Sequence, residues 1–312
     1  MPRHTDTSVD RTADPVAQPW LNPSAMAEEM RAQTPLGHFR GLDIISFSGD
    51  DCPATLNAIG YHREAGFRAA GAGRGEALDL DHRDTGPGSY QQLVAWDPQH
   101  SELVALYRFQ LGRHAVGAGL STLRTYQLFD YSPAFCDQVL PYAMELGRSV
   151  VNRSARKGAL GFFATWVGLG ALLRQYPEVD YFFGNVSLYD TLPDAGRDLL
   201  VAYMHRQYAP PQPMLRARDD VRYTPRTAVD ALSIPDPDGP ESRINQLRDR
   251  LSPWDMAIPP VLQSYMSLST GIWCGETVVD ADFGNALELG LIVPVDTIND
   301  RIRQRFIDVT PS

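Results

Sequence analysis

Two strand-like runs joined by a four-residue turn constrain the fold of this chain more than any other feature. Gln91–Asp97 and Glu102–Leu111 are dominated by apolar, β-branched and aromatic side chains, and the turn between them reads Pro-Gln-His-Ser. This pattern predicts an antiparallel β-hairpin. The hairpin is expected inside a larger sheet, to which other parts of the chain contribute strands.

The order of the remaining elements indicates the fold class. Further strands are predicted at 39–48, 142–151, Tyr181–Leu188, 272–280 and 287–295, and helices at 53–70, 159–176, 194–208 and 257–268. No internal repeat is visible. Helices interspersed with strands in this irregular order predict one α/β domain with a mixed sheet, rather than a regular βαβ repeat.

Composition sets the domain boundaries that we expect. Residues 1–25 are rich in Pro, Asp, Thr and Ala without periodicity, which predicts a flexible leader. A single domain is predicted at 26–309. Within it, residues 209–253 are rich in Pro, Arg and Asp. We interpret them as a long excursion that covers the site rather than as an independent domain.

Charge and cysteine content exclude several classes of function. The net charge of −10 and the pI of about 5.1 argue against general nucleic-acid binding, which needs a broad basic surface. The three cysteines have no CxxC spacing, and no histidine pattern suits a metal, so we expect free thiols and no metal site. No signal peptide is recognisable, and the most apolar segment is about 15 residues long, short of the roughly 20 that span a bilayer. A cytoplasmic protein is predicted.

Two charged residues interrupt segments that otherwise resemble buried strands. Arg108 and Glu145 each stand in an apolar run, where an unpaired charge costs several kcal/mol, on the order of 3–5. One interpretation is a structural salt bridge between neighbouring strands. The other is a polar pocket at the sheet, where a carboxylate takes a proton from an attacking amine. In a regular strand Arg148 faces away from Glu145, unless a bulge at Gly147 breaks the alternation.

A basic loop precedes the predicted helix 159–176. It contains Arg153, Arg156, Lys157 and Gly158. Backbone N–H groups at a helix N-terminus, together with basic side chains, suit a phosphate group. A solvated basic turn explains the same residues without any ligand.

Four motifs occur in the order in which a known family has them: an Arg-x-x-x-Phe helix, an acidic loop, an arginine on the following strands and a Glu-x-x-Arg strand. In this chain they are formed by Arg63 and Phe67, Asp81 and Asp84, Arg108, and Glu145 and Arg148. From about residue 59 to 295 the chain resembles the ornithine- and glycine-lipid N-acyltransferases, the hemolysin-like branch of the GNAT superfamily. It is more distantly similar to acyl-homoserine-lactone synthases. Residues 259–284 look most like the glycine-lipid branch.

The resemblance implies a GNAT-like mixed, splayed central sheet flanked by helices. It implies that the pantetheine arm of a thioester lies in the cleft beside the Glu145 strand. The donor is then a long-chain, often 3-hydroxylated, acyl group on acyl carrier protein or coenzyme A, and the acceptor is a small amino acid. No permanently bound cofactor is expected, and peripheral membrane contact is possible. The usual Gln-x-x-Gly-x-Gly pyrophosphate loop of GNAT enzymes is missing, which fits a carrier-protein donor better.

The roles expected for individual residues follow from these two lines of argument. Glu145 takes the proton of the attacking amine, backbone N–H groups near Gly147 hold the oxyanion, and direct transfer needs no covalent intermediate. Two alternatives stay open: synthesis of a diffusible acyl-amino-acid or acyl-lactone signal, and a non-catalytic acyl-binding module. The expected catalytic residues are Glu145, Arg148 and Arg63, those for substrate binding are Phe67, Asp81, Asp84 and Arg108, and those for donor binding are Arg153, Arg156, Lys157 and Gly158.

Overall fold

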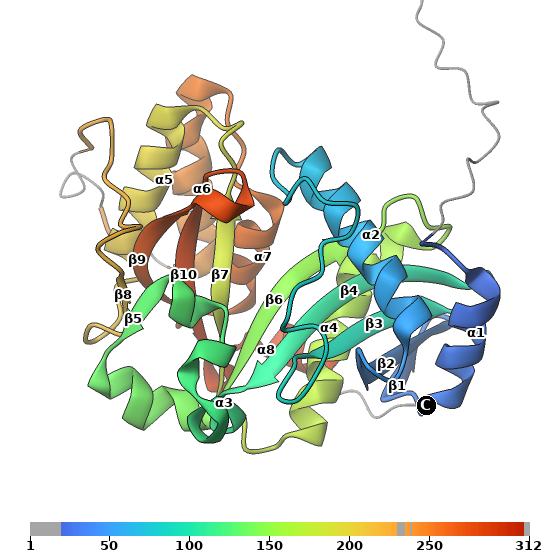
Figure 1. Cartoon of the computed structure of the whole chain (residues 1–312). Helices are drawn as coiled ribbons and strands as arrows, with labels where there is room; N and C mark the ends of the chain where they lie inside the picture. Colours follow the sequence, from blue (N-terminus) through green and yellow to red (C-terminus); the bar gives the residue numbers. More distant parts are fainter. Residues whose placement is uncertain (1–19, 230–234, 238, 309–312) are drawn as a thin grey trace, which may run out of the picture.

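An eight-stranded mixed sheet forms the centre of the protein (Figure 1), seen in a computed structural model that describes residues 20–229, 235–237 and 239–308. Neighbouring strands are antiparallel except for one central pair, β6 and β7, which is parallel. This architecture confirms the predicted α/β fold class. In spatial order the strands are β1 (Gly37–Phe39), β2 (Leu42–Ser48), β3 (Gln91–Asp97), β4 (Glu102–Leu111), β6 (Ala143–Val151), β7 (Tyr181–Leu188), β10 (Ala286–Pro294) and β9 (Trp273–Asp280).

Helices cover both faces of this sheet, because each face carries an apolar set of side chains. One hydrophobic cluster joins the sheet to α1 (Pro23–Ala32) and α2 (Pro53–Ala69), and α2 crosses the front of the sheet in Figure 1. A larger cluster joins it to the helices of the opposite face. These are α4 (Gly161–Gln175), α5 (Asp194–Gln207), α6 (Gly239–Leu251) and α7 (Pro260–Leu268).

The parallel pair β6 and β7 separates part-way along its length. Among the described residues, Cα pairing between them runs from Ala143 opposite Tyr181 to Leu146 opposite Gly184. At that last pair the backbones are so close that a Cβ on Gly184 would lie 2.4 Å from the carbonyl oxygen of Leu146. Both strands continue beyond this point, to Val151 and Leu188, and diverge as the ribbons of Figure 1 show. The sheet is therefore splayed at its centre.

A bulge in β6 lies where the two strands begin to diverge. On the β4 side Leu106 pairs with Val150 and Arg108 with Gly147, so β6 contains one residue more than β4 between these pairs. Arg148 lies within the bulge, and its φ of 54° is in the left-handed region. A bulge of this kind changes the direction of the side chains that follow it. The sequence left two alternatives open for Arg148, the other face of the sheet or a bulge at Gly147, and the structure has the bulge.

The bounds predicted for the hairpin strands and for β7 coincide with those observed, but several other elements were missed. These are α1, α3 (Gly112–Ala118), α6, α8 (Asp300–Ile302) and the three-residue strands β1, β5 (Phe129–Tyr131) and β8 (Leu215–Ala217). α1 begins within the predicted leader, because Pro23 occupies the first helical turn and the Asn22 side chain accepts a hydrogen bond from the N–H of Ala25. Residues 1–19 of that leader lie outside the described residues.

The first part of the Pro-, Arg- and Asp-rich excursion 209–253 follows the edge of the sheet, and its last part forms α6. β8 pairs with β5, and Arg222 bridges to Val278 on the edge strand β9. An edge strand exposes unpaired backbone groups, and a covering segment satisfies them. None of the described residues of the excursion lines the cavity described below. Among the described helices, none has both the length and the apolar character that crossing a bilayer demands.

Candidate active site

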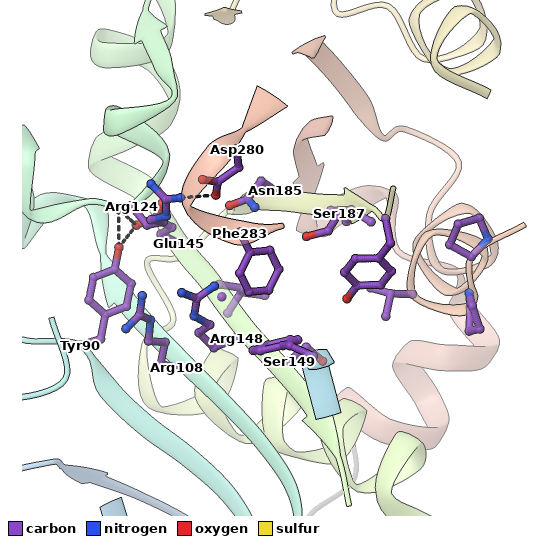
Figure 2. A pocket seen from close by; sticks show the side chains of 18 residues that line it. Tyr90, Arg108, Arg124, Glu145, Arg148, Ser149, Asn185, Ser187, Asp280 and Phe283 are labelled. Atoms are coloured by element: carbon purple, nitrogen blue, oxygen red, sulfur yellow. Dashed lines mark hydrogen bonds and ion pairs between the residues drawn. The ribbon is translucent and has the colours of Figure 1, made fainter. Parts of the chain in front are cut away.

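A cavity of about 140 Å³ opens where β6 and β7 separate (Figure 2). Residues 145–149 of β6 form one wall, and residues 185–187 of β7 with Tyr189 form the opposite wall. The N-terminus of α7 closes one end with residues 259–261. Phe67 of α2 and Phe283, next to β10, add aromatic surface, and Tyr90, Arg108, Arg124 and Asp280 complete the lining.

Glu145 is buried in this wall and is bound by neutral donors. Its Oε1 accepts a hydrogen bond from the backbone N–H of Thr125 at 2.7 Å. Its Oε2 accepts one from the Tyr90 hydroxyl and one from the backbone N–H of Arg124 at 3.2 Å. Within the described part of the chain, no cation forms an ion pair with this carboxylate. The structural salt bridge with Arg108 that the sequence left open is not formed.

The loop before β5 supplies the groups that hold Glu145. Tyr90 precedes β3, and its hydroxyl accepts from the N–H of Arg124 at 2.8 Å while donating to Glu145. Burial, and then the negative charge of Glu145, raise the pKa of Tyr90 well above its usual value, so this hydroxyl stays a donor at neutral pH. The Arg124 side chain extends across the cavity to Asp280, with which it forms an ion pair.

Arg148 enters the cavity from the bulge of β6. Its Nε lies 2.9 Å from a carboxylate oxygen of the buried Asp79, in the acidic loop. Its guanidinium group lies over the rings of Phe67 and Phe283, with 5.5 and 4.8 Å to their centroids. Burial lowers the pKa of Arg148 to about 10 despite Asp79, so the group remains a cation at neutral pH. A planar guanidinium in this setting suits a carboxylate ligand.

Arg63 and Arg108 bind the acidic loop in a buried network below the cavity floor. Arg63 donates to Asp84 at 2.9 Å and to Gln92 at 2.6 Å, and it is fully buried. Arg108 donates to both Asp81 and Asp84 at 3.0 Å. Arg108 reaches the cavity lining, whereas Arg63, Asp81 and Asp84 do not.

The charges of this network are strongly coupled. Burial by itself would raise the pKa of Asp81, but the charge and hydrogen bonds of Arg108 outweigh it and lower that pKa to about 2. Burial is likewise outweighed at Asp84, where Arg63 and Arg108 hold the pKa well below its usual range. Asp81 and Asp84 are thus ionised at neutral pH, and the network ties α2 and the acidic loop to β4.

The basic loop 152–158 lies apart from the cavity lining. Lys157 Nζ contacts the carbonyl oxygen of Gly41 at 2.9 Å and Asp97 at 3.1 Å, so this side chain points to the hairpin. Arg153 and Arg156 are exposed, and Gly158 is buried against the backbone of Asn152. The structure thus brings Glu145, Arg148, Arg108 and Phe67 together, but not the four residues expected to bind the donor.

A second polar cluster on the opposite wall had not been predicted. Glu288 of β10 is buried, and the two cavity-lining side chains Asn185 and Ser187 donate to its carboxylate. Its signal was present in the sequence, since Glu288 interrupts an apolar run in the same way as Glu145 does. Tyr90 and Arg124 gave no such signal, because they lie in irregular segments. Tertiary contacts alone bring them to the site.

Comparison with known proteins identifies the family. The family described as "Acetyltransferase (GNAT) domain" matches residues 61–166. A protein of Phocaeicola vulgatus named "Glycine N(alpha)-acyltransferase" is 32% identical over 275 residues, which is 85% of this chain and 84% of the relative. The chain belongs to the GNAT superfamily of N-acyltransferases. A second protein with the same name, from Bacteroides thetaiotaomicron, is 34% identical over 280 residues, 84% of this chain and 81% of the relative.

The GNAT match covers the elements that build the cavity. Residues 61–166 include Phe67, the acidic loop, the β3–β4 hairpin and the whole of β6 with its bulge. The opposite wall, formed by β7 and β10, lies C-terminal to the match. No solved structure gives a significant match to this chain. As a GNAT N-acyltransferase the protein is an acyl-transferring enzyme, and the resemblance in the sequence is confirmed.

Proposed function

We propose that this enzyme transfers a long-chain fatty-acyl group from a thioester to the amine of a small amino acid, with glycine as the first candidate. Two relatives that align with more than four-fifths of the chain carry the name "Glycine N(alpha)-acyltransferase". The thioester is on acyl carrier protein or coenzyme A, and the acyl chain is of the type found in ornithine and glycine lipids. The amine attacks the thioester directly.

The free acceptor site on Glu145 supports its role as general base. A carboxylate has about four positions at which it accepts hydrogen bonds. Tyr90 and the N–H groups of Arg124 and Thr125 occupy three of them. One position on Oε1 is left for the proton of an attacking nitrogen, taken directly or through a water. This arrangement at the cavity wall is the observation that carries the proposal.

The arginines define where the rest of the acceptor would bind. Arg148 offers the guanidinium edge that Asp79 leaves unoccupied, and we assign it to the carboxylate of the amino acid. Arg108 and Arg63 hold Asp81 and Asp84 and thereby position the floor of the cavity. In this proposal Arg63 acts through its neighbours and does not contact the substrate.

The thioester would lie in the gap between the diverging strands. Beyond Leu146 and Gly184, the described parts of β6 and β7 no longer pair, and backbone N–H groups near Gly147 are suited to hold the oxyanion of the tetrahedral intermediate. A cavity of about 140 Å³ is smaller than the roughly 300–1,000 Å³ of sites that enclose a whole drug-sized ligand. It therefore suits the thioester group and the amine that attacks it, while a long acyl chain extends past α7.

Incubation of the purified protein with defined donors and an amino-acid panel tests the reaction. Long-chain acyl thioesters of acyl carrier protein and of coenzyme A are offered in parallel with glycine, ornithine, serine and a simple alkylamine. We expect thiol release together with an N-acyl amino acid of the predicted mass, with glycine giving the highest rate. Absence of thiol release with every donor would favour the non-catalytic acyl-binding alternative and overturn the proposal.

The exposed arginines of the basic loop test which donor is used. We propose that Arg153 and Arg156 contact a carrier protein, because both side chains are exposed beside the helix that follows β6. The double charge reversal Arg153→Glu and Arg156→Glu should raise KM for the acyl carrier protein thioester by ~10-fold or more and leave kcat within about twofold. An equal effect on an acyl-pantetheine thioester, which has no protein surface, would contradict a carrier-protein contact.

A long-chain product also implies contact with lipid. We propose a cytoplasmic enzyme of lipid biosynthesis that touches the membrane peripherally. The exposed side chains Phe162 and Val261 lie at the N-termini of α4 and α7, and Val261 also lines the cavity. Sedimentation with phospholipid vesicles, comparing the wild type with a Phe162→Ser and Val261→Ser double variant, measures this contact. Equal binding of the two proteins would argue against this surface.

A further inference from the structure

The wall formed by β7 and β10 contains a carboxyl group connected to the cavity through a hydroxyl. Glu288 and Ser187 are directly opposite each other in the two strands, and Ser187 Oγ donates to Glu288 Oε1 at 2.7 Å. Asn185 Nδ2 donates to Oε2 at 2.5 Å. Ser187 and Asn185 line the cavity, whereas Glu288 is 1% exposed. Figure 2 shows both lining side chains on the strand that faces Arg148 across the cavity.

The surroundings of Glu288 differ from those of Asp280, the nearby carboxylate on β9. Its two hydrogen-bond donors are neutral, whereas Asp280, at the end of β9, is paired with Arg124. Burial raises the pKa of Glu288 to about 7, and the charge of Asp280 adds to this while Arg124 opposes it. Tyr189 also faces this carboxyl group, since burial and then the charge of Glu288 raise the pKa of Tyr189 to about 12. Glu288 is therefore suited to exchange a proton near neutral pH.

The chemistry of amide formation needs more than one proton-handling group. An α-amino group is largely protonated at neutral pH, since its ordinary pKa is about 8. It loses one proton to become a nucleophile and a second when the amide forms. The leaving thiolate takes up one of the two, and the other is released. A single carboxylate would have to pass on the first proton before it could accept the second.

We propose that Ser187 and Glu288 form a second proton path, which deprotonates the incoming ammonium ion. The inference rests on the proposed function. Ser187 Oγ accepts a proton from the ammonium nitrogen while the hydroxyl proton of Ser187 passes to Glu288 Oε1. One N–H bond and one O–H bond break, two O–H bonds form, and the result is a neutral amine and a protonated Glu288. Glu145 then takes the second proton as the C–N bond forms, and it gives that proton to the thiolate that leaves when the C–S bond breaks. Glu288 returns its proton to solvent before the next cycle.

The two paths have different places in the cavity. Glu145 and its donors belong to the β6 wall, and Ser187 belongs to the facing β7 wall. The two paths therefore act on the nitrogen from opposite walls of the cavity. Ser187 is the group that touches the substrate, and Glu288 acts through it as a positioning and proton-holding residue.

The pH dependence of turnover tests the second path. The wild type should show kcat rising with pH through an inflection near pH 7, because only ionised Glu288 accepts the proton. Glu288→Gln keeps the size of the side chain, and we expect it to remove this inflection and lower kcat by ~100-fold. Glu276→Gln on the neighbouring strand β9, outside the cavity lining, is the matched control and should keep the wild-type profile. An inflection near pH 7 retained in Glu288→Gln would overturn the proposal.

A pair of substitutions at Ser187 keeps the test decisive if Glu288→Gln fails to fold. Ser187→Thr retains a hydroxyl and should retain the inflection, whereas Ser187→Ala should lose it together with most of the turnover. Identical pH profiles of the two variants would refute the path. Product formation by the wild type is measured first, so a failure of the proposed function shows as the absence of any N-acyl product. If this inference alone fails, the wild type is active and the variants keep its turnover and its pH profile.

Discussion

Glu145 and Arg148 line the same cavity although they are three positions apart on one strand. In a regular strand their side chains would face opposite sides of the sheet. The extra residue in β6 and the positive φ of Arg148 remove this conflict. As a result, a group that can bind a carboxylate and a group that can accept a proton lie side by side, as an amino acid substrate requires.

Replacement of Glu145 tests its role as base. Glu145→Gln keeps the size of the side chain and one acceptor oxygen, which can still bind Tyr90 and the N–H of Arg124, the two donors of Oε2. We therefore expect a folded protein with kcat lower by about 10²–10⁴. Turnover assays and circular dichroism measure the two properties. Glu178→Gln, at an exposed ion pair with Arg113, is the control and should keep full activity. Near-normal turnover of Glu145→Gln would remove Glu145 from this role.

Arg148 should contribute to binding of the acceptor more than to the chemical step. Arg148→Lys keeps the charge but loses the planar pair of donors, and a hydrogen bond to a charged group is worth about 1.5–3 kcal/mol. We expect KM for the amino acid to rise ~10–100-fold, with a smaller change in kcat. Arg68→Lys, an exposed residue of α2 paired with Glu64, serves as control. Initial-rate kinetics with varied acceptor would contradict the assignment if KM stayed constant.

Two glycines at the strand separation should respond to alanine in opposite ways. A Cβ on Gly147 meets no atom within 4 Å, so Gly147→Ala should leave the melting temperature unchanged while its methyl group enters the cavity and lowers kcat/KM. A Cβ on Gly184 would lie 2.4 Å from the backbone of Leu146, so Gly184→Ala should cost about 1–3 kcal/mol of stability. Thermal melts and kinetics of both variants check this contrast. A destabilised Gly147→Ala protein would argue against it.

The buried network should make stability sensitive to acid. The pKa of Asp81 is lowered from 3.8 to about 2, so its stabilising contribution is present above about pH 4 and is lost as the pH falls towards 2. Removal of one partner leaves a buried charge without compensation, and Asp84→Asn should cost about 3–5 kcal/mol at pH 7. Urea unfolding at pH 7 and at pH 3 measures both effects. Asp130→Asn, at an exposed side chain, should change neither.

Glu288 should act on stability in the opposite direction. Its pKa is raised from 4.5 to about 7, so the folded state loses stability as the pH rises through this range. The shift corresponds to about 3 kcal/mol. Glu288→Gln has no ionisable group at this position. The stability of this variant relative to the wild type should therefore be greater at pH 8 than at pH 5. Equal differences at the two pH values would indicate an ordinary carboxyl group.

Long, regular elements were predictable because their patterns are local. The β3 and β4 strands have the predicted bounds, since alternation and a turn signal define a hairpin without reference to the rest of the chain. Strands of three residues, such as β5 and β8, carry no periodicity of their own. They exist because two distant segments meet, which a local pattern does not record.

The site was partly predictable for a related reason. Glu145 and Arg108 were noticeable because a charge in an apolar strand is costly and requires an explanation. Lys157 looked equally suited to a phosphate, yet it binds Asp97, which lies 60 positions away in the sequence. Its orientation depends on how the hairpin packs against the end of β6. The identity of a charged side chain was visible in the sequence, but its partner was not.

The early end of the β6–β7 pairing has a consequence for how a donor could be held. Two parallel strands that part after four residue pairs leave an opening in the sheet beyond Leu146 and Gly184. A flexible arm with amide groups can fill it as an extended peptide would, by pairing with backbone rather than with side chains. Recognition of this kind does not depend on which side chains the two strands carry. The two halves of the sheet would then be joined through the molecule on which the enzyme acts.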